Sequence, residues 1–314
     1  MTVAAPTFTS QLVNGILAIK PIADLAKHQA RTMMIKRAES IGVYWRQDVQ
    51  TLRSRNSTAE FSPIWDAELR QLQTPGLVYP NYYLTSFHAY KQGNLSWEAA
   101  MEVEAAAHAV HARLFPDAGA QGDAMLRQSY HAVLQQQLPQ PPQTVLDIGC
   151  GVGMSTFAMQ AAYPQAQITG VDLSPYFLAI AQYRANERIS QTVAPVNWLH
   201  AAAEATGLPS ASFDLVSAHL VFHELPQTAA KAILQESRRL LRPGGHLAIM
   251  DMNPQSEVYK KLPPYILTLL KSTEPYLDEY FALDLQQTIA AAGFTTPTIT
   301  CNSARHRTVI AQAC

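Results

Sequence analysis

The sequence predicts an α/β fold, a doubly wound sheet of mostly parallel strands that follows an N-terminal group of helices. Three observations carry this prediction. From Thr144 onward, short apolar runs alternate with helical patterns, which is typical of parallel strands joined by helices. Residues 1–115 show only helical and loop patterns. Two β-rich segments, 295–302 and 305–313, lie so close in sequence that we expect them to be antiparallel neighbours.

Composition narrows the class of protein. The chain has 314 residues, enough for about two domains, and 48% of them are hydrophobic. The formal net charge of −1 argues against a nucleic-acid partner, which usually calls for a basic excess. Three scattered cysteines form no CxxC pair, and no apolar run reaches the ~18 residues of a membrane span. We therefore expect a cytoplasmic protein of a reducing compartment, without a secretory signal.

The N-terminal part predicts several helices. Apolar residues recur at helical spacing from Ile22 to Leu52, in a region where basic residues outnumber acidic ones. This basic amphipathic helix can pack on the core with a solvated face or lie on an anionic membrane surface. A second helix spans 94–115, with Asn94 or Ser96 as its N-cap. After a boundary loop at 116–123, a third helix is predicted.

The remaining elements follow in the order expected of a doubly wound sheet. Ser174 followed by Pro175 predicts a capped helix start. The stretch between the fifth strand and the last helix is longer than a connection needs. Predicted strands are 144–149, 166–173, 196–201, 213–220 and 242–253, and predicted helices are 124–138, 153–163, 174–188, 228–241 and 278–292.

The first strand runs into a glycine-rich turn, "VLDIGCGVGM" at 145–154. The second strand ends at Asp172, where an acid hydrogen-bonds ribose hydroxyls in folds of this kind. NAD and S-adenosylmethionine both contain a ribose. The dinucleotide fingerprint needs a third glycine, but Met154 or Thr156 occupies its place. Asp147 precedes the first glycine by two residues and can fix the turn or meet a charged amino group, which NAD lacks.

Four stretches resemble, in order and spacing, the successive motifs of class I S-adenosylmethionine-dependent methyltransferases. They are "VLDIGCGVG", "VDLSP", "AEATGLPSASFDLV" and "LRPGGHLAIMD". The resemblance covers roughly 125–314 and extends to the group that includes ubiquinone/menaquinone-biosynthesis enzymes and other small-molecule methyltransferases. Residues 79–107 look like a segment of uncharacterised methyltransferase-like proteins of cyanobacteria and plant plastids.

The resemblance implies a Rossmann-like fold that binds S-adenosylmethionine and releases S-adenosylhomocysteine. By position, the glycines lie against the methionine part, Asp172 binds the ribose and Leu173 packs on the adenine. The family usually has an acid facing the adenine amino group where this chain has Ala202, so either Glu204 or backbone groups replace it, or the contact is missing. The expected cofactor-binding residues are Asp147, Gly149, Cys150, Gly151, Gly153, Asp172, Leu173, Ala203, Glu204 and His219.

Two histidines are candidates for the catalytic base. Methyl transfer to O–H or N–H needs a group that accepts a proton, and His219 and His223 follow the fourth strand, near the expected methyl group. His219 can instead line the cofactor, and either histidine can simply hold a loop. They stand four apart without an HExxH order, so no metal site is predicted.

An aromatic run before the predicted core suggests an acceptor lid, although core packing explains such a run equally well. The chain lacks the Asn/Asp-Pro-Pro-aromatic segment typical of methyltransferases acting on adenine bases or glutamine side chains, which favours a small-molecule acceptor. The expected substrate-binding residues are Tyr82, Tyr83, His88, Tyr90 and Trp97.

The sequence therefore predicts an S-adenosylmethionine-dependent methyltransferase acting on O, N or C of a small molecule. A non-catalytic cofactor-binding protein of the same fold and an NAD-dependent oxidoreductase are the alternatives. We expect a helical cap and acceptor lid at 1–123 and a cofactor-binding core at 124–314, with 253–277 as a candidate cap insertion. Oligomeric state is not readable from the sequence.

Overall fold

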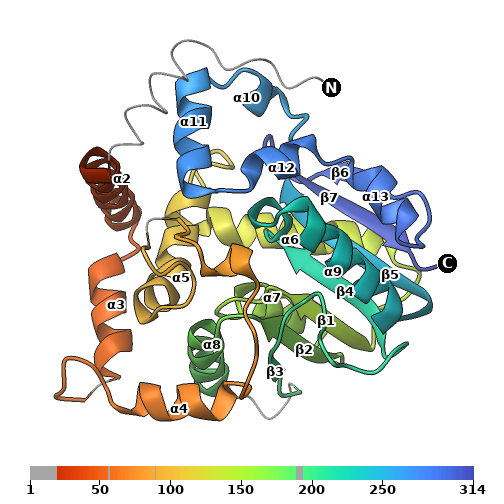
Figure 1. Ribbon diagram of the computed structural model, residues 1–314, viewed down its shortest axis with the longest axis horizontal. Helices are drawn as coiled ribbons and strands as arrows, with labels where there is room; N and C mark the ends of the chain where they lie inside the picture. Colours follow the sequence, from red (N-terminus) through yellow and green to blue (C-terminus); the bar gives the residue numbers. More distant parts are fainter. Residues whose placement is uncertain (1–19, 56, 89, 189–193) are drawn as a thin grey trace.

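A seven-stranded sheet forms the centre of the computed structural model, which describes residues 20–314 except 56, 89 and 189–193 (Figure 1). The strand order is β3-β2-β1-β4-β5-β7-β6. β1 to β5 are parallel, and β7 is antiparallel to both of its neighbours, as predicted. The strands are β1(Thr144–Ile148), β2(Gln167–Asp172), β3(Asn197–His200), β4(Phe213–His219), β5(Leu241–Met252), β6(Thr298–Cys301) and β7(His306–Gln312).

The strand order reverses between β1 and β4, and this reversal determines where a ligand can bind. In open α/β sheets, ligands bind beyond the carboxyl ends of the strands at such a switch point. Gly149 begins a turn at this edge of the sheet. The parallel strands β2, β4 and β5 have their carboxyl ends at the same edge.

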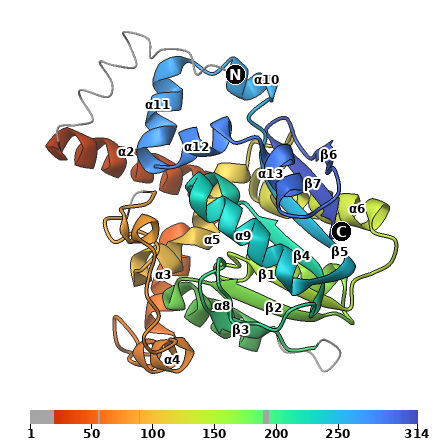
Figure 2. The same ribbon diagram turned by 45° about the vertical axis from the view of Figure 1, so that its right-hand side comes forward.

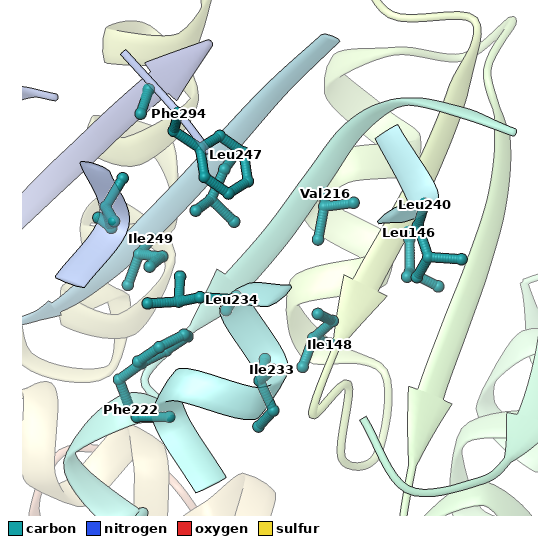
Figure 3. Packing of buried hydrophobic residues seen from close by; sticks show 14 of the residues in the cluster. Leu146, Ile148, Val216, Phe222, Ile233, Leu234, Leu240, Leu247, Ile249 and Phe294 are labelled. Atoms are coloured by element: carbon teal, nitrogen blue, oxygen red, sulfur yellow. The ribbon is translucent and has the colours of Figure 1, made fainter. Parts of the chain in front are cut away.

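Helices cover both faces of the sheet. One face carries a buried cluster that includes Leu126 and Tyr130 of α6, and the other carries α9 and α13. In Figure 3, Ile233 and Leu234 of α9 extend toward the strand residues Ile148 and Ile249. The helices of this region are α6(Gly122–Gln137), α7(Met154–Ala162), α8(Pro175–Glu187), α9(Gln227–Leu240), α10(Glu257–Lys260), α11(Pro264–Thr273), α12(Leu277–Ala282) and α13(Leu285–Ala291).

Two predicted helices are each divided in the structure. The helical spacing over 22–52 belongs to two helices, because Gly42 adopts a left-handed φ of 85° and ends the first. The helix predicted over 278–292 is divided at Leu283, and the Asp284 side chain caps the second part by accepting from the Gln287 amide. The prediction of one continuous helix was wrong in both places.

The N-terminal helices lie beside the carboxyl ends of the parallel strands (Figures 1 and 2). Their cluster with α8 includes Val152, a residue of the glycine turn. Ser96 caps α5, because its hydroxyl accepts from the Ala99 amide. The elements are α2(Lys20–Ser40), α3(Trp45–Ser54), α4(Ile64–Leu72), the 3₁₀ helix η1(Asn81–Leu84) and α5(Trp97–His111), with a second 3₁₀ helix, η2(Gly119–Gln121), before α6.

Candidate active site

The turn after β1 requires its three glycines. Gly149, Gly151 and Gly153 have φ values of 63°, 55° and 86°, a region that L side chains rarely adopt. A Cβ on Gly149 would lie 2.6 Å from Cγ2 of Val221, and one on Gly153 would lie 2.8 Å from Cε2 of Phe157. The turn therefore presents bare backbone to any ligand above it.

Asp147 fixes this turn from below. Its Oδ2 accepts from the Ser155 hydroxyl at 2.7 Å and the Thr156 hydroxyl at 2.6 Å, which tie β1 to the first turn of α7. Burial raises the pKa of Asp147 to about 6, although these two hydrogen bonds oppose the shift. Its Oδ1 is buried and has no hydrogen-bond partner in the described part of the chain.

Asp172 links the end of β2 to the same turn. Its Oδ2 accepts from the Gly151 amide at 2.8 Å, and its Oδ1 accepts from the Ser174 amide at 2.7 Å. Burial raises the pKa of Asp172 to about 6. A carboxylate offers about four lone-pair sites, so a ligand hydroxyl can still be accepted. The Tyr83 hydroxyl lies 3.5 Å from Oδ1, and Leu173 is buried beside it.

Glu204 lies beyond the end of β3. It is one of the groups expected to replace the acid missing at Ala202 in the adenine contact. Tyr82 of η1 donates its hydroxyl to Glu204 Oε1 at 2.7 Å. The second oxygen, Oε2, is buried and has no partner among the described residues. Ala203 packs against the main hydrophobic cluster of the sheet.

His219, the last residue of β4, is buried beside a network that sequence reasoning missed. Its Nδ1 lies 3.4 Å from Nη1 of Arg127, and its Nε2 has no partner in the described chain. Burial and the Arg127 charge hold the pKa of His219 well below its usual range, so the ring is neutral. Arg127 donates to Asp123, which also pairs with His111 at 2.7 Å. The only sequence signal for Arg127 is its place on the helix before β1.

His223 is paired with Asp251, an acid at the end of β5 that sequence reasoning also missed. The His223 Nδ1 lies 2.7 Å from Asp251 Oδ1, and the His223 amide donates to Oδ2 at 3.2 Å. Burial opposes the charged imidazole, but the charge and hydrogen bond of Asp251 outweigh it and raise the pKa of His223 to about 10. The signal that could have found Asp251 is the one that found Asp147 and Asp172, an acid that ends an apolar strand.

His88 approaches this pair from the cap. Its φ of 50° lies in the left-handed region, a strained position for a residue other than glycine. Its Nε2 lies 3.0 Å from Oε1 of Glu274 and 3.9 Å from Oε1 of Glu224. Burial opposes protonation, but Glu274 raises the pKa of His88 to about 8. Its amide donates to the Thr273 carbonyl at 2.9 Å, which joins the cap to the segment 253–277.

The predicted aromatic run separates into three groups. Tyr82 and Tyr83 contact the acids Glu204 and Asp172, whereas His88 faces the His223 side. Tyr90 and Trp97 lie in the cap interior. The Tyr90 hydroxyl donates to Glu102 at 2.9 Å, and the Trp97 ring packs against Phe61, Trp65 and Tyr176.

The unpartnered atoms test whether this edge suits a nucleoside-type ligand with an amino acid group. Buried polar atoms are nearly always hydrogen-bonded in folded proteins. Ten buried side-chain atoms of the described residues have no partner, and three of them belong to residues predicted to bind the cofactor: Asp147 Oδ1, Glu204 Oε2 and His219 Nε2. S-adenosylmethionine offers an ammonium group, an adenine amino group and ribose hydroxyls, so the residues present fit it.

A separate cavity lies beside this edge of the sheet. A cavity of about 630 Å³ between α5, α6 and α7 touches Arg127 and Met154 but none of Asp172, Glu204 or His223. Within the described ranges, no three His, Cys, Asp or Glu side chains gather as a metal site, and no helix is long and apolar enough to cross a membrane.

Comparison with known proteins agrees with the motifs. Residues 145–245 match a family model described as a methyltransferase domain. An uncharacterised methyltransferase of Synechocystis sp. is 30% identical over 155 residues, which cover 49% of this chain and 68% of that protein. A malonyl-[acyl-carrier protein] O-methyltransferase of Anoxybacillus flavithermus is 36% identical over 34% of this chain, and this chain spans 39% of its length.

A solved structure supports the fold. A Nostoc punctiforme protein described as a candidate O-methyltransferase superimposes with a TM-score of 0.50 at 17% identity, covering 79% of this chain and 66% of that one. At this identity the likeness concerns the fold alone. With the ordered motifs, the glycine turn, the acid at the end of β2 and the Synechocystis relative, the chain belongs to the class I S-adenosylmethionine-dependent methyltransferases.

Proposed function

We propose that this protein transfers the methyl group of S-adenosylmethionine to a small-molecule acceptor. The observation that carries the proposal is the shared edge of the sheet. The glycine turn and Asp172 lie at the ends of β1 and β2, His223 follows β4, and its partner Asp251 lies at the end of β5. A cofactor half and a proton-accepting half thus meet across the topological switch point.

The cofactor supplies an activated methyl group at a sulfonium, so the protein has to align the acceptor and manage its proton. The turn backbone from Gly149 to Gly153 suits the methionine part, and Asp172 suits the ribose hydroxyls. Arg127, whose Nη2 lies 3.9 Å from Sδ of Met154 at the start of α7, is the proposed cation for the methionine carboxylate. His219 is neutral, and its Nε2 has no partner among the described residues. Because its lowered pKa makes it a weak base, we assign it the role of lining the cofactor site near the methyl group.

His223 is the proposed proton acceptor for an O–H or N–H acceptor. Asp251 takes Nδ1, so Nε2 is the nitrogen left to face the substrate. Asp251 also orients the ring, as carboxylates do in other histidine–acid pairs. A carbon acceptor would use the same pocket for positioning, and O, N and C all remain within the proposal.

We assign residues 1–123 the role of a lid over a core at 124–314. The lid reaches both halves of the site, through Tyr83 near Asp172 and through His88 near Glu224. The hydrogen bond from His88 to Thr273 supports including 253–277 in that lid.

The basic amphipathic segment 22–52, most of which α2 forms, can pack on the protein or contact a membrane. Packing is supported by Ile35 and Ala38, which are buried against α5, and by the ion pair of Arg31 with Glu102. Met33 is 65% exposed, and this side of α2 is the one that would contact a membrane.

The test uses purified protein, S-adenosylmethionine with a radiolabelled methyl group, and an extract of the source organism, which is partitioned after incubation. Label in small molecules of either phase supports the proposal. Label in the organic phase further supports an apolar acceptor and membrane contact by α2, whereas aqueous label supports packing. Binding of S-adenosylhomocysteine without labelling of any fraction would replace the proposal by a non-catalytic cofactor-binding protein. A melting temperature raised by NADH would favour an oxidoreductase.

A further inference from the structure

The cavity between α5, α6 and α7 has walls made largely of small side chains. Ala124 and Ala132, which lie on one face of α6, line it from one side, and Ala158, Ala161 and Ala162 of α7 line it from the other. Side chains of this length do not fill the space between the two helices, and about 630 Å³ stays open. Ligand pockets have volumes of roughly 300–1,000 Å³ and mostly apolar walls. The cavity therefore has the size and the lining of a site for a small molecule.

His131 brings a buried, unpartnered nitrogen to this cavity. The residue lines the cavity from α6 and is only 7% exposed. Its Nδ1 has no hydrogen-bond partner in the described part of the chain, although buried polar atoms nearly always have one. Burial, with the Arg127 charge, lowers the pKa of His131 to about 4, so the ring is neutral at pH 7. A neutral imidazole nitrogen can exchange a hydrogen bond with a ligand hydroxyl or carbonyl group.

Both acids that line the cavity are neutralised by partners. Glu104 of α5 pairs with Arg184 at 2.8 Å. Asp123 of α6 pairs with Arg127 and with His111, each at 2.7 Å. The acids of the cavity therefore leave no unpaired negative charge that would select a cationic ligand.

Arg188 lines the cavity as a cation without an acid of its own. Its guanidinium carbon lies 4.3 Å from the centroid of the Phe157 ring, a cation–π contact that holds the group at the cavity wall. It forms no ion pair with any described residue, since the adjacent acid, Glu187, pairs with Arg184 at 3.0 Å instead. A guanidinium group binds a carboxylate through two parallel hydrogen bonds. The charge of this wall thus favours an anion.

We propose that this cavity is a second ligand site, separate from the cofactor edge, for a small organic acid with an apolar body and a further oxygen group. The apolar body packs against the alanines of α6 and α7, the carboxylate binds Arg188, and the further hydroxyl or carbonyl group binds Nδ1 of His131. None of these residues takes part in the proposed methyl transfer, so the inference stands independently of that reaction.

The test is calorimetric titration of the full chain with three probes: 6-hydroxy-2-naphthoate, 2-naphthol, which lacks the carboxylate, and 2-naphthoate, which lacks the hydroxyl. We expect the wild type to bind the hydroxynaphthoate roughly 10- to 100-fold more tightly than 2-naphthol, as a hydrogen bond to a charged group predicts, and severalfold more tightly than 2-naphthoate. Arg188→Gln should reduce the first ratio to within about threefold. His131→Phe should abolish the second ratio and keep the first. Ala158→Leu, which fills the cavity, should weaken all three probes by at least about tenfold.

Arg70→Gln is the matched control, because Arg70 is an exposed arginine of α4 outside the cavity lining, and it should leave every ratio unchanged. Saturating S-adenosylhomocysteine should leave the hydroxynaphthoate bound. Displacement by S-adenosylhomocysteine, equal binding of hydroxynaphthoate and 2-naphthol by the wild type, an unchanged first ratio in Arg188→Gln, or no binding of any probe would each overturn the inference. If thermal unfolding shows that His131→Phe or Ala158→Leu does not fold, Arg188→Gln decides, because Arg188 is exposed and its replacement leaves the core intact.

Discussion

At the scale of single residues, two histidines four positions apart acquire opposite properties from their partners. Burial disfavours the charged form of both. Arg127 adds to this effect at His219 and lowers its pKa further. Asp251 reverses it at His223 and raises the pKa to about 10. The two rings therefore differ in charge at neutral pH, although they arise from one short stretch of sequence.

The first prediction concerns His223. His223→Gln should lower kcat by roughly 10²- to 10⁴-fold for an O–H or N–H acceptor, because the proton acceptor is lost. The affinity for S-adenosylhomocysteine should stay within about threefold of wild type. Turnover of the labelled product and calorimetric titration measure the two quantities. His246→Gln, at a histidine in the middle of β5, is the control, and equal activity of the two variants would refute the role.

The second prediction concerns pH. At pH 7 His223 is largely protonated, so the activity of a histidine base should rise about tenfold per pH unit up to a pH of about 10. Asp251→Asn removes the charge that raises this pKa, and should shift the rise to lower pH while lowering the maximal rate. A profile of kcat/KM against pH checks this expectation. The same midpoint in both proteins would show that His223 is not the titrating group.

At the scale of elements, the joint between β1 and α7 holds the cofactor edge together. The turn combines left-handed glycines with close approach to neighbouring side chains, and the side-chain hydrogen bonds of Asp147 fasten it to the helix. A side chain at such a position costs about 1–2 kcal/mol for the backbone alone.

The third prediction separates backbone strain from contact. Gly153→Ala and Gly207→Ala both place a Cβ at positive φ, 86° and 72°, but only at Gly153 would it meet other atoms, at 2.8 Å from Phe157 and 2.9 Å from Trp198. We expect Gly207→Ala to cost about 1 kcal/mol of unfolding free energy. Gly153→Ala should cost more and also weaken S-adenosylhomocysteine binding. Denaturant unfolding and titration measure both effects, and equal losses would mean that the contacts relax freely.

At the scale of the whole molecule, the cap and the sheet meet through buried polar groups as well as apolar ones. His200 accepts from the Thr74 amide at 2.8 Å, and Ser174 donates to the Asn94 carbonyl at 2.6 Å. Two histidines of the core are buried and neutral, His131 of α6 and His306 of β7, whose pKa values are lowered to about 4 and about 3. Neutral histidines of this kind make folding sensitive to acid.

The fourth prediction follows from His131. Its pKa falls from 6.5 in the unfolded chain to about 4 in the folded one. Burial is the larger cause, and the Arg127 charge adds to it. The folded state therefore binds fewer protons than the unfolded state. The contribution of neutral His131 to the free energy of unfolding is about 3 kcal/mol. It is complete above pH 6.5 and is lost as the pH falls toward 4. His131→Phe should remove that part of the pH dependence. Unfolding free energies at pH 7.5 and 5 measure it, with exposed Gln128→Ala as the control. An unchanged dependence would contradict the pKa.

Local patterns predicted much of the architecture, including the glycine turn and the acids beside it. Alternating strands and helices, the cap at Ser174 and the glycine turn are short-range signals, because each depends on residues that are close in the chain. The same is true of Asp147 and Asp172, which end apolar strands. The breaks at Gly42 and Leu283 were missed, because apolar spacing continues across both of them.

The partnerships that give the site its chemistry depend on tertiary structure. Asp251 follows His223 by 28 residues, and Tyr82 precedes Glu204 by 122, so no spacing rule relates either pair. The sequence by itself determined the fold class, the glycine turn, the acid that ends β2 and the family. Only the tertiary structure decided which histidine is charged, which tyrosines contact Glu204 and Asp172, and which aromatics stay in the cap. The physical reason is that pKa values and hydrogen bonds depend on burial and neighbours, which are set when distant strands and the cap come together at one edge.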